Sequence, residues 1–213
     1  MAGPIMNPIR RIISSLFILL FSLSMAITLT IWISPFIYSM IISWFNLEAT
    51  AGLTRDDLML NYQVIINYLM NPSIEHLQMP FFSMSEGGRV HFEEVKLLFF
   101  INFVIDGSLL IAVIYCIHNI RKNSYQLYMQ SCFYFHLAFP LILLFFIIVS
   151  FDQVFILFHR FLFNNELWLF NPLTDPVITV LPQNFFMILF ILALLIYELI
   201  ILFIRFIVNW GRL

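Results

Sequence analysis

The sequence has few charged residues and almost no cysteine. Only 10% of its 213 residues are charged, whereas a soluble domain carries roughly a quarter. This composition argues against a soluble domain, and the absence of a basic patch argues against a nucleic-acid partner. The two cysteines, Cys116 and Cys132, fall near a loop that we expect to face the reducing cytosol. We therefore interpret both as free, small apolar residues and not as a disulfide.

Apolar residues dominate what remains. They make up 62% of the chain, and 26 of them are phenylalanine. A membrane-spanning helix needs about 20 mostly apolar residues. Four segments meet this requirement, at about 12–33, 97–117, 133–151 and 185–208. The first is too long for a signal-peptide core, so we expect it to be retained. The sequence thus predicts an all-α membrane protein with four transmembrane helices in one integral domain, 1–213.

Lysine and arginine predict the orientation of these spans. Loops on the cytoplasmic side carry an excess of both residues. In a four-span layout, six of them fall on one side: Arg10, Arg11, Arg121, Lys122, Arg205 and Arg212. Both termini are therefore expected in the cytoplasm, with the segments 34–96 and 152–184 outside. Ten of the twelve acidic residues lie in these two outer segments, in agreement with this orientation.

The first outer segment contains a predicted helix. In TRDDLMLNYQVIINYLM, apolar side chains recur at helical spacing from Leu58 to Leu69. Thr54 is the expected N-cap with Asp57 as an imperfect capping box, and Asn71-Pro72 should end the helix. We expect the following stretch to be extended or a loop, with a tight turn at Gly87-Gly88.

The second outer segment, 152–184, is too polar to span. We interpret it as an interfacial or re-entrant helix, a loop broken by Pro172 and Pro176, and a short return helix ending near Pro182. Asp152, His159 and Glu166 recur every seven residues, so on a helix they would share a face.

Polar residues also recur along the second span. On a helix, His91, Glu94, Asn102 and Asp106 lie on one face, which should point into the bundle. Asp106 could be structural or functional, and we interpret Lys96 as a snorkelling headgroup anchor. His136 lies one turn before Pro140, and we expect it to satisfy a carbonyl freed there.

Several familiar catalytic motifs are absent. The sequence has no HExxH, HxxxH or paired cysteines, so we expect no metal and no cofactor. It has no GxSxG elbow and no glycine-rich phosphate loop. Ser83 and Ser85 lie near His91, which leaves a serine-dependent membrane acyl hydrolase as one alternative.

Two blocks of sequence carry a resemblance to a known family. FFSMSEGGRVHFEEVKLLF resembles a Phe-Ser stretch followed by His-x-x-Asp/Glu-Val-Lys at a helix entrance, and FHRFLFNNELWLFNPLTDPVITVLPQNFF matches a Phe-His…Asn…Trp…Asp…Pro-x-x-Phe-Phe pattern. The helix with Tyr-x-x-x-x-x-Tyr-Leu and the four-span layout agree as well. The chain resembles the lipoprotein intramolecular transacylases, small bacterial integral membrane proteins. Glu94 stands where many relatives have Asp.

The resemblance implies an activity and a pair of catalytic residues. The sn-2 acyl chain of a diacylglyceryl lipoprotein would move to the α-amino group of its N-terminal cysteine, giving the lyso-form lipoprotein. The two characteristic histidines fall on His91 and His159. The enzyme would act at the outer leaflet of the bacterial cell membrane, in contact with membrane lipid, and we expect a monomer.

The residues suit this chemistry. An α-amine must lose a proton to attack, and the departing sn-2 oxygen must gain one, so one histidine could take a proton and the other give one. Orienting, headgroup-binding or oxyanion-stabilising roles could fall to nearby polar residues, namely Arg89, Glu94, Arg160, Asn164 and Asp175. Two non-enzymatic alternatives remain open: a transporter or channel component using Asn102, Asp106 and Glu198, and a structural or chaperone subunit.

Overall fold

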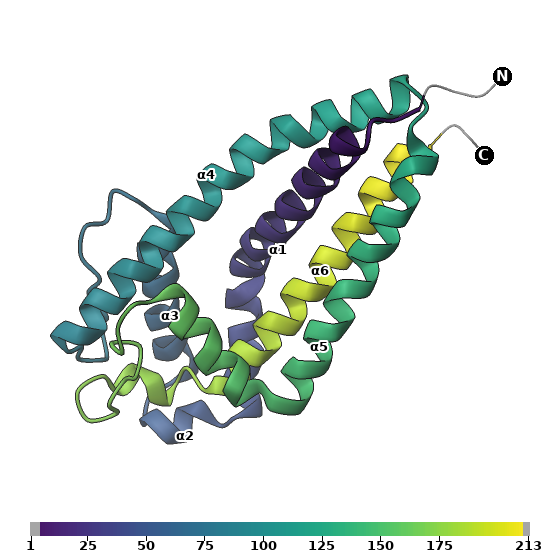
Figure 1. The fold of residues 1–213 in the computed structure, drawn as a ribbon. Helices are drawn as coiled ribbons and strands as arrows, with labels where there is room; N and C mark the ends of the chain where they lie inside the picture. Colours follow the sequence, from purple (N-terminus) through teal and green to yellow (C-terminus); the bar gives the residue numbers. More distant parts are fainter. Residues whose placement is uncertain (1–4, 211–213) are drawn as a thin grey trace. The chain divides into compact units, whose positions relative to one another are not determined.

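A computed structural model describes residues 5–210, and within that range every regular element is helical (Figure 1). The elements in chain order are α1 (Pro8–Trp44), α2 (Leu47–Ala51), α3 (Arg55–Met70), α4 (Glu86–Lys122), α5 (Gln126–Leu162), the 3-10 helix η1 (Pro176–Thr179) and α6 (Gln183–Asn209). The predicted all-α class is confirmed.

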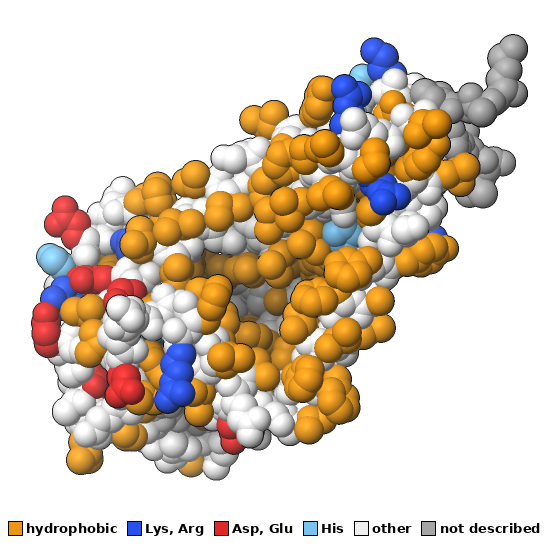
Figure 2. Space-filling view, in the orientation of Figure 1, with side chains coloured by type: hydrophobic (Ala, Val, Ile, Leu, Met, Phe, Trp, Pro, Cys, Tyr) orange, Lys and Arg blue, Asp and Glu red, His pale blue; other side chains and the backbone are white. Residues whose placement is uncertain are grey.

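Four helices, α1, α4, α5 and α6, are long and apolar enough to cross a membrane, which confirms the predicted four spans. Three of them have 37 residues, or about 55 Å of helix, against a hydrocarbon core of about 30 Å. The predicted spans are shorter than these helices. The reason is that apolar composition predicts which residues can lie in lipid, whereas a helix ends where its backbone hydrogen bonds end. Figure 2 shows broad areas of hydrophobic side chains on the surface, as lipid contact requires.

The chain folds into two compact units. Unit 1 holds residues 5–30, 102–148 and 191–210, and unit 2 holds residues 31–101 and 149–190. Each of the four long helices contributes residues to both units, so we retain the prediction that 1–213 is one integral membrane domain. Both predicted outer segments, 34–96 and 152–184, belong to unit 2.

The core of unit 1 is built where the four long helices meet. Its most buried side chains come from each of them: Ile18 from α1, Ile120 from α4, Phe133 from α5 and Ile201 from α6. Cys116 and Cys132 are both free, as predicted. The unit is therefore held mainly by apolar packing between helices.

A chain of hydrogen bonds joins α1 to α4 inside unit 1. Ser24 Oγ donates to Asn102 Oδ1 at 2.9 Å, and Asn102 Nδ2 donates to Thr28 Oγ1 at 2.8 Å. Thr28 Oγ1 in turn donates to Asp106, which is buried. The predicted inward polar face is thus confirmed for Asn102 and Asp106. Polar contacts of this kind join helices in a setting where water cannot satisfy them.

His136 corrects one expectation. Pro140 lacks an N–H, so the carbonyl it frees, four residues earlier, is that of His136 itself. Tyr197 Oη donates to this carbonyl at 3.3 Å, while the His136 ring pairs with Ser15 Oγ at 2.9 Å. The imidazole therefore joins α5 to α1 and does not bond the freed carbonyl.

Unit 2 packs α3 against the ends of α1 and α6. The predicted capping box of α3 is confirmed and complete, since Thr54 accepts from the Asp57 amide and the Asp57 carboxylate accepts from the Thr54 amide. Leu58, Tyr62, Ile65 and Leu69 are all buried, as predicted. Tyr62 stacks on Tyr38 of α1 with ring centroids 4.2 Å apart and donates to Ser34 Oγ at 2.8 Å. These contacts fix the first outer segment as folded protein.

The turn predicted at Gly87-Gly88 is wrong. Both glycines lie in the first turn of α4, which begins at Glu86, and neither has a positive φ. Glycine is required at position 88 by the close approach of Asp175, and not by the backbone conformation.

The second outer segment agrees with its prediction in part. Two helical stretches are joined in α5 at a break at Ser150 (φ −147°, ψ 50°), next to the predicted end of the third span at 151, and the second stretch runs to Leu162, where an interfacial or re-entrant helix was predicted. Asp152 and His159 therefore lie on this helix, but Glu166 follows its end and does not share the face. The predicted return helix is only η1, four residues long. Prolines at 172, 176 and 182 prevent a longer one.

Candidate active site

Two histidines from distant parts of the sequence meet inside unit 2. His91 lies in the second turn of α4 and His159 in the last turn of α5, and their ring centroids are 6.1 Å apart. His91 is 8% exposed. The first residue after α5, Phe163, continues the helical bonding by donating its amide to the His159 carbonyl at 2.8 Å, and its ring contacts both imidazoles. The helix end therefore sets the position of the pair.

Aromatic rings from the second outer segment enclose the histidines. Phe163 and Phe170 lie edge-on to His91, at centroid distances of 4.8 and 5.5 Å. Trp168 stacks on His159 at 4.7 Å, and its indole N–H donates to the Asn165 carbonyl at 3.1 Å. Of these side chains His91, Phe163 and Trp168 are buried, so the enclosure limits the access of water and strengthens the hydrogen bonds inside it.

The hydrogen bond of His159 defines its tautomer. Nδ1 lies 2.8 Å from the carbonyl oxygen of Phe155, one turn earlier on α5. A carbonyl can only accept, so Nδ1 carries the proton and Nε2 of the neutral ring holds a lone pair. On the other ring, His91 Nδ1 is buried and has no hydrogen-bond partner in the described structure. The pair thus presents one oriented base and one unpaired nitrogen.

Glu94 lies one turn after His91 on α4. Its Oε1 accepts from Asn165 Nδ2 at 2.7 Å, which ties α4 to the second outer segment. Its Oε2 is buried without a partner among the residues the structure describes. Buried polar atoms are nearly always paired, so this carboxylate oxygen, one helical turn from His91, has an unused capacity to accept a hydrogen bond.

Asp175 holds the start of α4 in place. It is 3% exposed, and its carboxylate accepts from the Ser85 amide and from Thr174 Oγ1, each at 2.7 Å. Burial disfavours the charged form of Asp175, but the hydrogen bonds from Thr174 and Ser85 outweigh it and lower the pKa of this carboxyl. A charged Asp175 thus connects the segment before η1 to the turn that carries His91.

Close packing at Asp175 explains Gly88. A Cβ at residue 88 would collide with Asp175 Oδ1, whereas one at residue 87 would meet only the end of the Leu167 side chain, at 3.3 Å. The Gly88 amide also donates to Ser85 Oγ at 3.0 Å. The glycine therefore allows the carboxylate to reach the helix backbone.

The remaining predicted site residues are not all turned to the histidines. Arg89 forms ion pairs with Glu86 and Glu93 on its own helix, while Arg160 and Asn164 are exposed. Neither Ser83 nor Ser85 is hydrogen-bonded to a histidine within residues 5–210: Ser83 donates to the Thr174 carbonyl and Ser85 accepts from Gly88. Within that range no cluster of three or more His, Cys, Asp or Glu has metal-site geometry.

Sequence reasoning missed Asn165, which binds Glu94, and the enclosing role of Phe163 and Phe170. Three adjacent positions, Phe163, Asn164 and Asn165, directly follow the helix, and nothing in their residue types distinguishes Asn164 from Asn165. The backbone turn after Leu162 decides which amide faces α4. A shift of one residue separates the amide that bonds Glu94 from the exposed amide of Asn164.

The fold and the site together define a class: a multi-pass membrane protein with an aromatic-enclosed pair of histidines, of which His91 is buried and His159 half-buried. Residues 12–186 match the family model described as lipoprotein intramolecular transacylase Lit. The chain belongs to this family, whose members are acyltransferases.

Solved structures agree with the family assignment. The membrane-integral Lit from Bacillus cereus is 26% identical, with a TM-score of 0.85 over 96% of each chain. Two forms of that protein with one histidine replaced, by arginine or by alanine, match with TM-scores of 0.74 and 0.77 at the same identity, over 95% and 96% of this chain and 93% and 94% of theirs. A comparison with curated protein sequences finds no match. The resemblance recognised from the sequence is thereby confirmed.

Proposed function

We propose that this protein moves the sn-2 acyl chain of a diacylglyceryl lipoprotein to the α-amino group of the same N-terminal cysteine, leaving a lyso-form lipoprotein. The main support is the pairing of His91 and His159, with ring centroids 6.1 Å apart, in a member of a transacylase family. Amine and ester belong to one substrate, so the enzyme needs to align them and manage protons. Alignment of this kind is worth several kcal/mol of barrier.

His159 acts as the base. The α-ammonium loses one proton to solvent, and His159 Nε2 removes a second as the nitrogen attacks the ester carbonyl carbon. The carbonyl of Phe155, which accepts from Nδ1, stabilises the imidazolium that forms. This bond has the role that an orienting carboxylate has in a catalytic triad.

His91 serves the leaving group. As the bond between the carbonyl carbon and the sn-2 oxygen breaks, that oxygen takes a proton from His91 and becomes a hydroxyl. The proton held on His159 then returns to His91, which restores both rings. The C–N bond replaces the C–O bond, and no acyl-enzyme forms.

Glu94 binds the substrate ammonium before it is deprotonated. Its Oε1 is already occupied by Asn165, and its buried Oε2 is unpaired in the described structure. An ammonium offers the N–H donors that this oxygen lacks. The oxyanion of the tetrahedral intermediate is stabilised by Arg160, Asn164 or Arg89. Of these, Arg89 is already engaged by two carboxylates.

The site faces the outer leaflet, with both termini in the cytoplasm, and a monomer suffices. The support is the charge distribution: ten of twelve acidic residues lie in the segments 34–96 and 152–184, which belong to unit 2, as do both histidines. Lysine and arginine in short loops set the orientation of a membrane protein.

A mass-spectrometric assay tests the reaction. A synthetic diacylglyceryl lipopeptide is incubated with the purified protein in detergent and fragmented. Total mass stays constant, the N-terminal fragment gains one acyl group, and the glyceryl part loses one. An N-acetylated lipopeptide, which has no nucleophile, serves as the control. Unchanged fragments after incubation with folded wild-type protein would refute the proposed activity.

The role of Glu94 is tested in the same assay by Glu94→Gln. The variant keeps the shape and an acceptor for Asn165 but loses the charge. We expect KM to rise about 10- to 100-fold, the equivalent of a charge-assisted hydrogen bond of about 1.5–3 kcal/mol, with a smaller change in kcat. Glu93→Gln, at the preceding residue and paired with Arg89, is the matched control. A Glu94→Gln enzyme with wild-type KM would remove Glu94 from substrate binding and leave the proposed reaction intact.

A further inference from the structure

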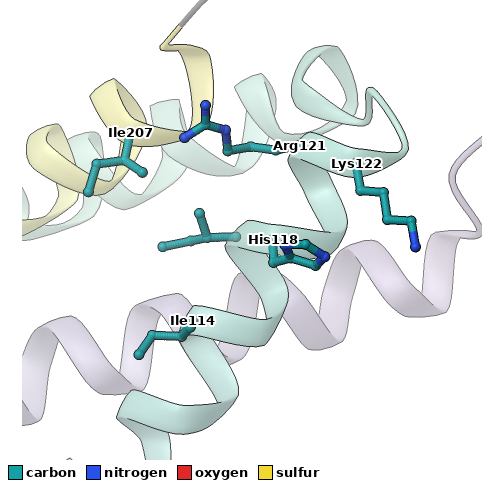
Figure 3. A pocket seen from close by; sticks show the side chains of 6 residues that line it. Ile114, His118, Arg121, Lys122 and Ile207 are labelled. Carbon is teal, nitrogen blue, oxygen red and sulfur yellow. The ribbon is translucent and has the colours of Figure 1, made fainter.

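A groove on unit 1 combines an apolar floor with basic walls. It has a volume of about 620 Å³ and lies between the last two turns of α4 and the end of α6. Its lining residues are Ile114, Ile117, His118, Arg121, Lys122 and Ile207. Figure 3 shows these side chains projecting from the two helices, with Arg121 reaching towards α6. None of these residues belongs to the histidine site, which lies in unit 2.

The charge around this groove is of one sign. Among the described residues of unit 1, five are Lys or Arg and only two, Asp106 and Glu198, are acidic. Asp106 precedes His118 by twelve residues, about 18 Å along α4, and Glu198 precedes Ile207 by nine, about 13 Å along α6. No carboxylate on the described parts of these two helices in unit 1 is therefore near enough to neutralise Arg121 and Lys122.

The two cations retain free donors. Arg121 Nη2 donates to the Trp210 carbonyl at 3.3 Å, which occupies one of five N–H groups, and both side chains are exposed. On α4, Ile117 and Ile114 lie about one and two turns before Arg121, on the side of the apolar part of the helix. A molecule that fits has an anionic oxygen-rich head and hydrocarbon tails.

We propose that this groove binds an anionic phospholipid, with the phosphate at Arg121, Lys122 adding positive charge at the same end of α4, and the acyl chains along Ile114, Ile117 and Ile207. The two basic side chains favour an anionic headgroup, and the three isoleucines favour a lipid over a free anion, because only a lipid has acyl chains to cover them. Basic pockets between spanning helices are suited to such headgroups. The site is separate from the acyl-transfer chemistry and would act as a fixed anchor for the ends of α4 and α6.

The test compares lipids by native mass spectrometry of the detergent-purified protein. Phosphatidylglycerol should bind well above phosphatidylcholine of identical acyl chains, and glycerol phosphate, which has the head alone, should bind far more weakly than the lipid. In the double variant Arg121→Gln/Lys122→Gln, affinity for phosphatidylglycerol should fall about 30-fold, as expected for the loss of two basic residues. Lys122→Gln alone, which disturbs no hydrogen bond of α6, should show a smaller fall in the same direction.

The matched control is Arg10→Gln/Arg11→Gln, which removes the same charge from unit 1 outside the groove. It should leave phosphatidylglycerol binding close to the wild-type value. Three results would each overturn the proposal: equal binding of the two lipids, an equal fall in the control variant, or glycerol phosphate binding as tightly as the lipid. Acyl transfer measured in parallel separates the two questions, since the groove variants should remain active even where lipid binding is lost.

Discussion

The two compact units use the same four long helices for different purposes. The described part of unit 1 is almost purely helical packing, with polar groups that bond helix to helix, such as Asn102 to α1. Unit 2 holds ten of the twelve acidic residues, all of α2, α3 and η1, and the histidine pair. Buried side-chain atoms without a partner occur in both described units: on Ser22, Asp106, Gln126 and Glu198 in unit 1, and on Asn61, His91 and Glu94 in unit 2. Unit 2 differs in that two of them, His91 Nδ1 and Glu94 Oε2, lie one helical turn apart on α4, at the histidine pair. The two units therefore differ in the aromatic and histidine cluster that surrounds these atoms, and not in the presence of unpaired polar atoms.

The largest expected effect contrasts histidines of the two units. His91→Ala and His159→Ala should each reduce acyl transfer by about 10²- to 10⁴-fold, because a positioned acid or base contributes that much. His136→Ala, in unit 1, removes the bonds of the ring to Ser15 and Tyr197 and should stay active with some loss of stability. Turnover is measured by fragment mass and folding by circular dichroism. Wild-type rates in either unit 2 variant would end its catalytic role.

The second-largest effect on activity is expected from substitution of one of two neighbouring glycines in unit 2. Gly88→Ala should lower activity about tenfold or more, because its Cβ forces Asp175 away and moves the turn that carries His91, and small misplacements cost large factors in rate. Gly87→Ala should be mild, since the Leu167 side chain can give way. The two rates are compared under the same conditions. If both variants behave alike, the contact between Asp175 and α4 does not position the site.

Asp175 should make the stability of unit 2 depend on pH. Its folded pKa is lowered, so its contribution is present above the unfolded value of about 3.9 and is lost as pH falls through the folded value. Asp175→Asn should destabilise the protein by about 1.5–3 kcal/mol at neutral pH, with the difference shrinking below about pH 4. Denaturation midpoints of both proteins across pH give the comparison. A stability difference between wild type and Asp175→Asn that stays constant with pH would show that the negative charge of Asp175 does not contribute to stability.

The smallest effect is expected in unit 1. Thr28→Val removes the bonds to Asn102 and Asp106, whereas Thr30→Val removes only a bond to its own helix, at the Ala26 carbonyl. Both threonines are 6% exposed. The first variant should be less stable than the second by about 1 kcal/mol, with both active. Lost acyl transfer in a folded Thr28→Val protein would instead involve this cluster in the reaction.

The sequence predicts a structural feature well where a pattern of residue types or the family resemblance indicates it. Four apolar runs, the capping box at Thr54 and the meeting of His91 with His159 all followed from pattern or from family resemblance. Local geometry was less accessible. Helix ends extend beyond the apolar runs, Gly87 and Gly88 lie inside α4 with Asp175 packed against Gly88, and the predicted return helix is only the four-residue η1. These depend on packing between segments far apart in the sequence, which no local pattern contains.

The site residues divide in the same way. Residue type identified the imidazoles and Glu94, since titratable groups are rare in so apolar a chain. It could not choose Asn165 over Asn164, nor reveal that Arg89 is occupied by Glu86 and Glu93. Those choices are made by side-chain direction, which changes by about 100° with each residue on a helix and less predictably in a loop.

The partner that orients His159 is a main-chain oxygen. A substitution at position 155 changes the side chain and keeps the main-chain oxygen, so the hydrogen bond that selects the tautomer is retained. In a catalytic triad, by contrast, substitution of the carboxylate removes the corresponding acceptor. Natural variants and saturation libraries should therefore tolerate change at Phe155 far better than its position beside the imidazole suggests. We expect His159 Nδ1 to lose this bond only where a substitution unwinds the last turns of α5.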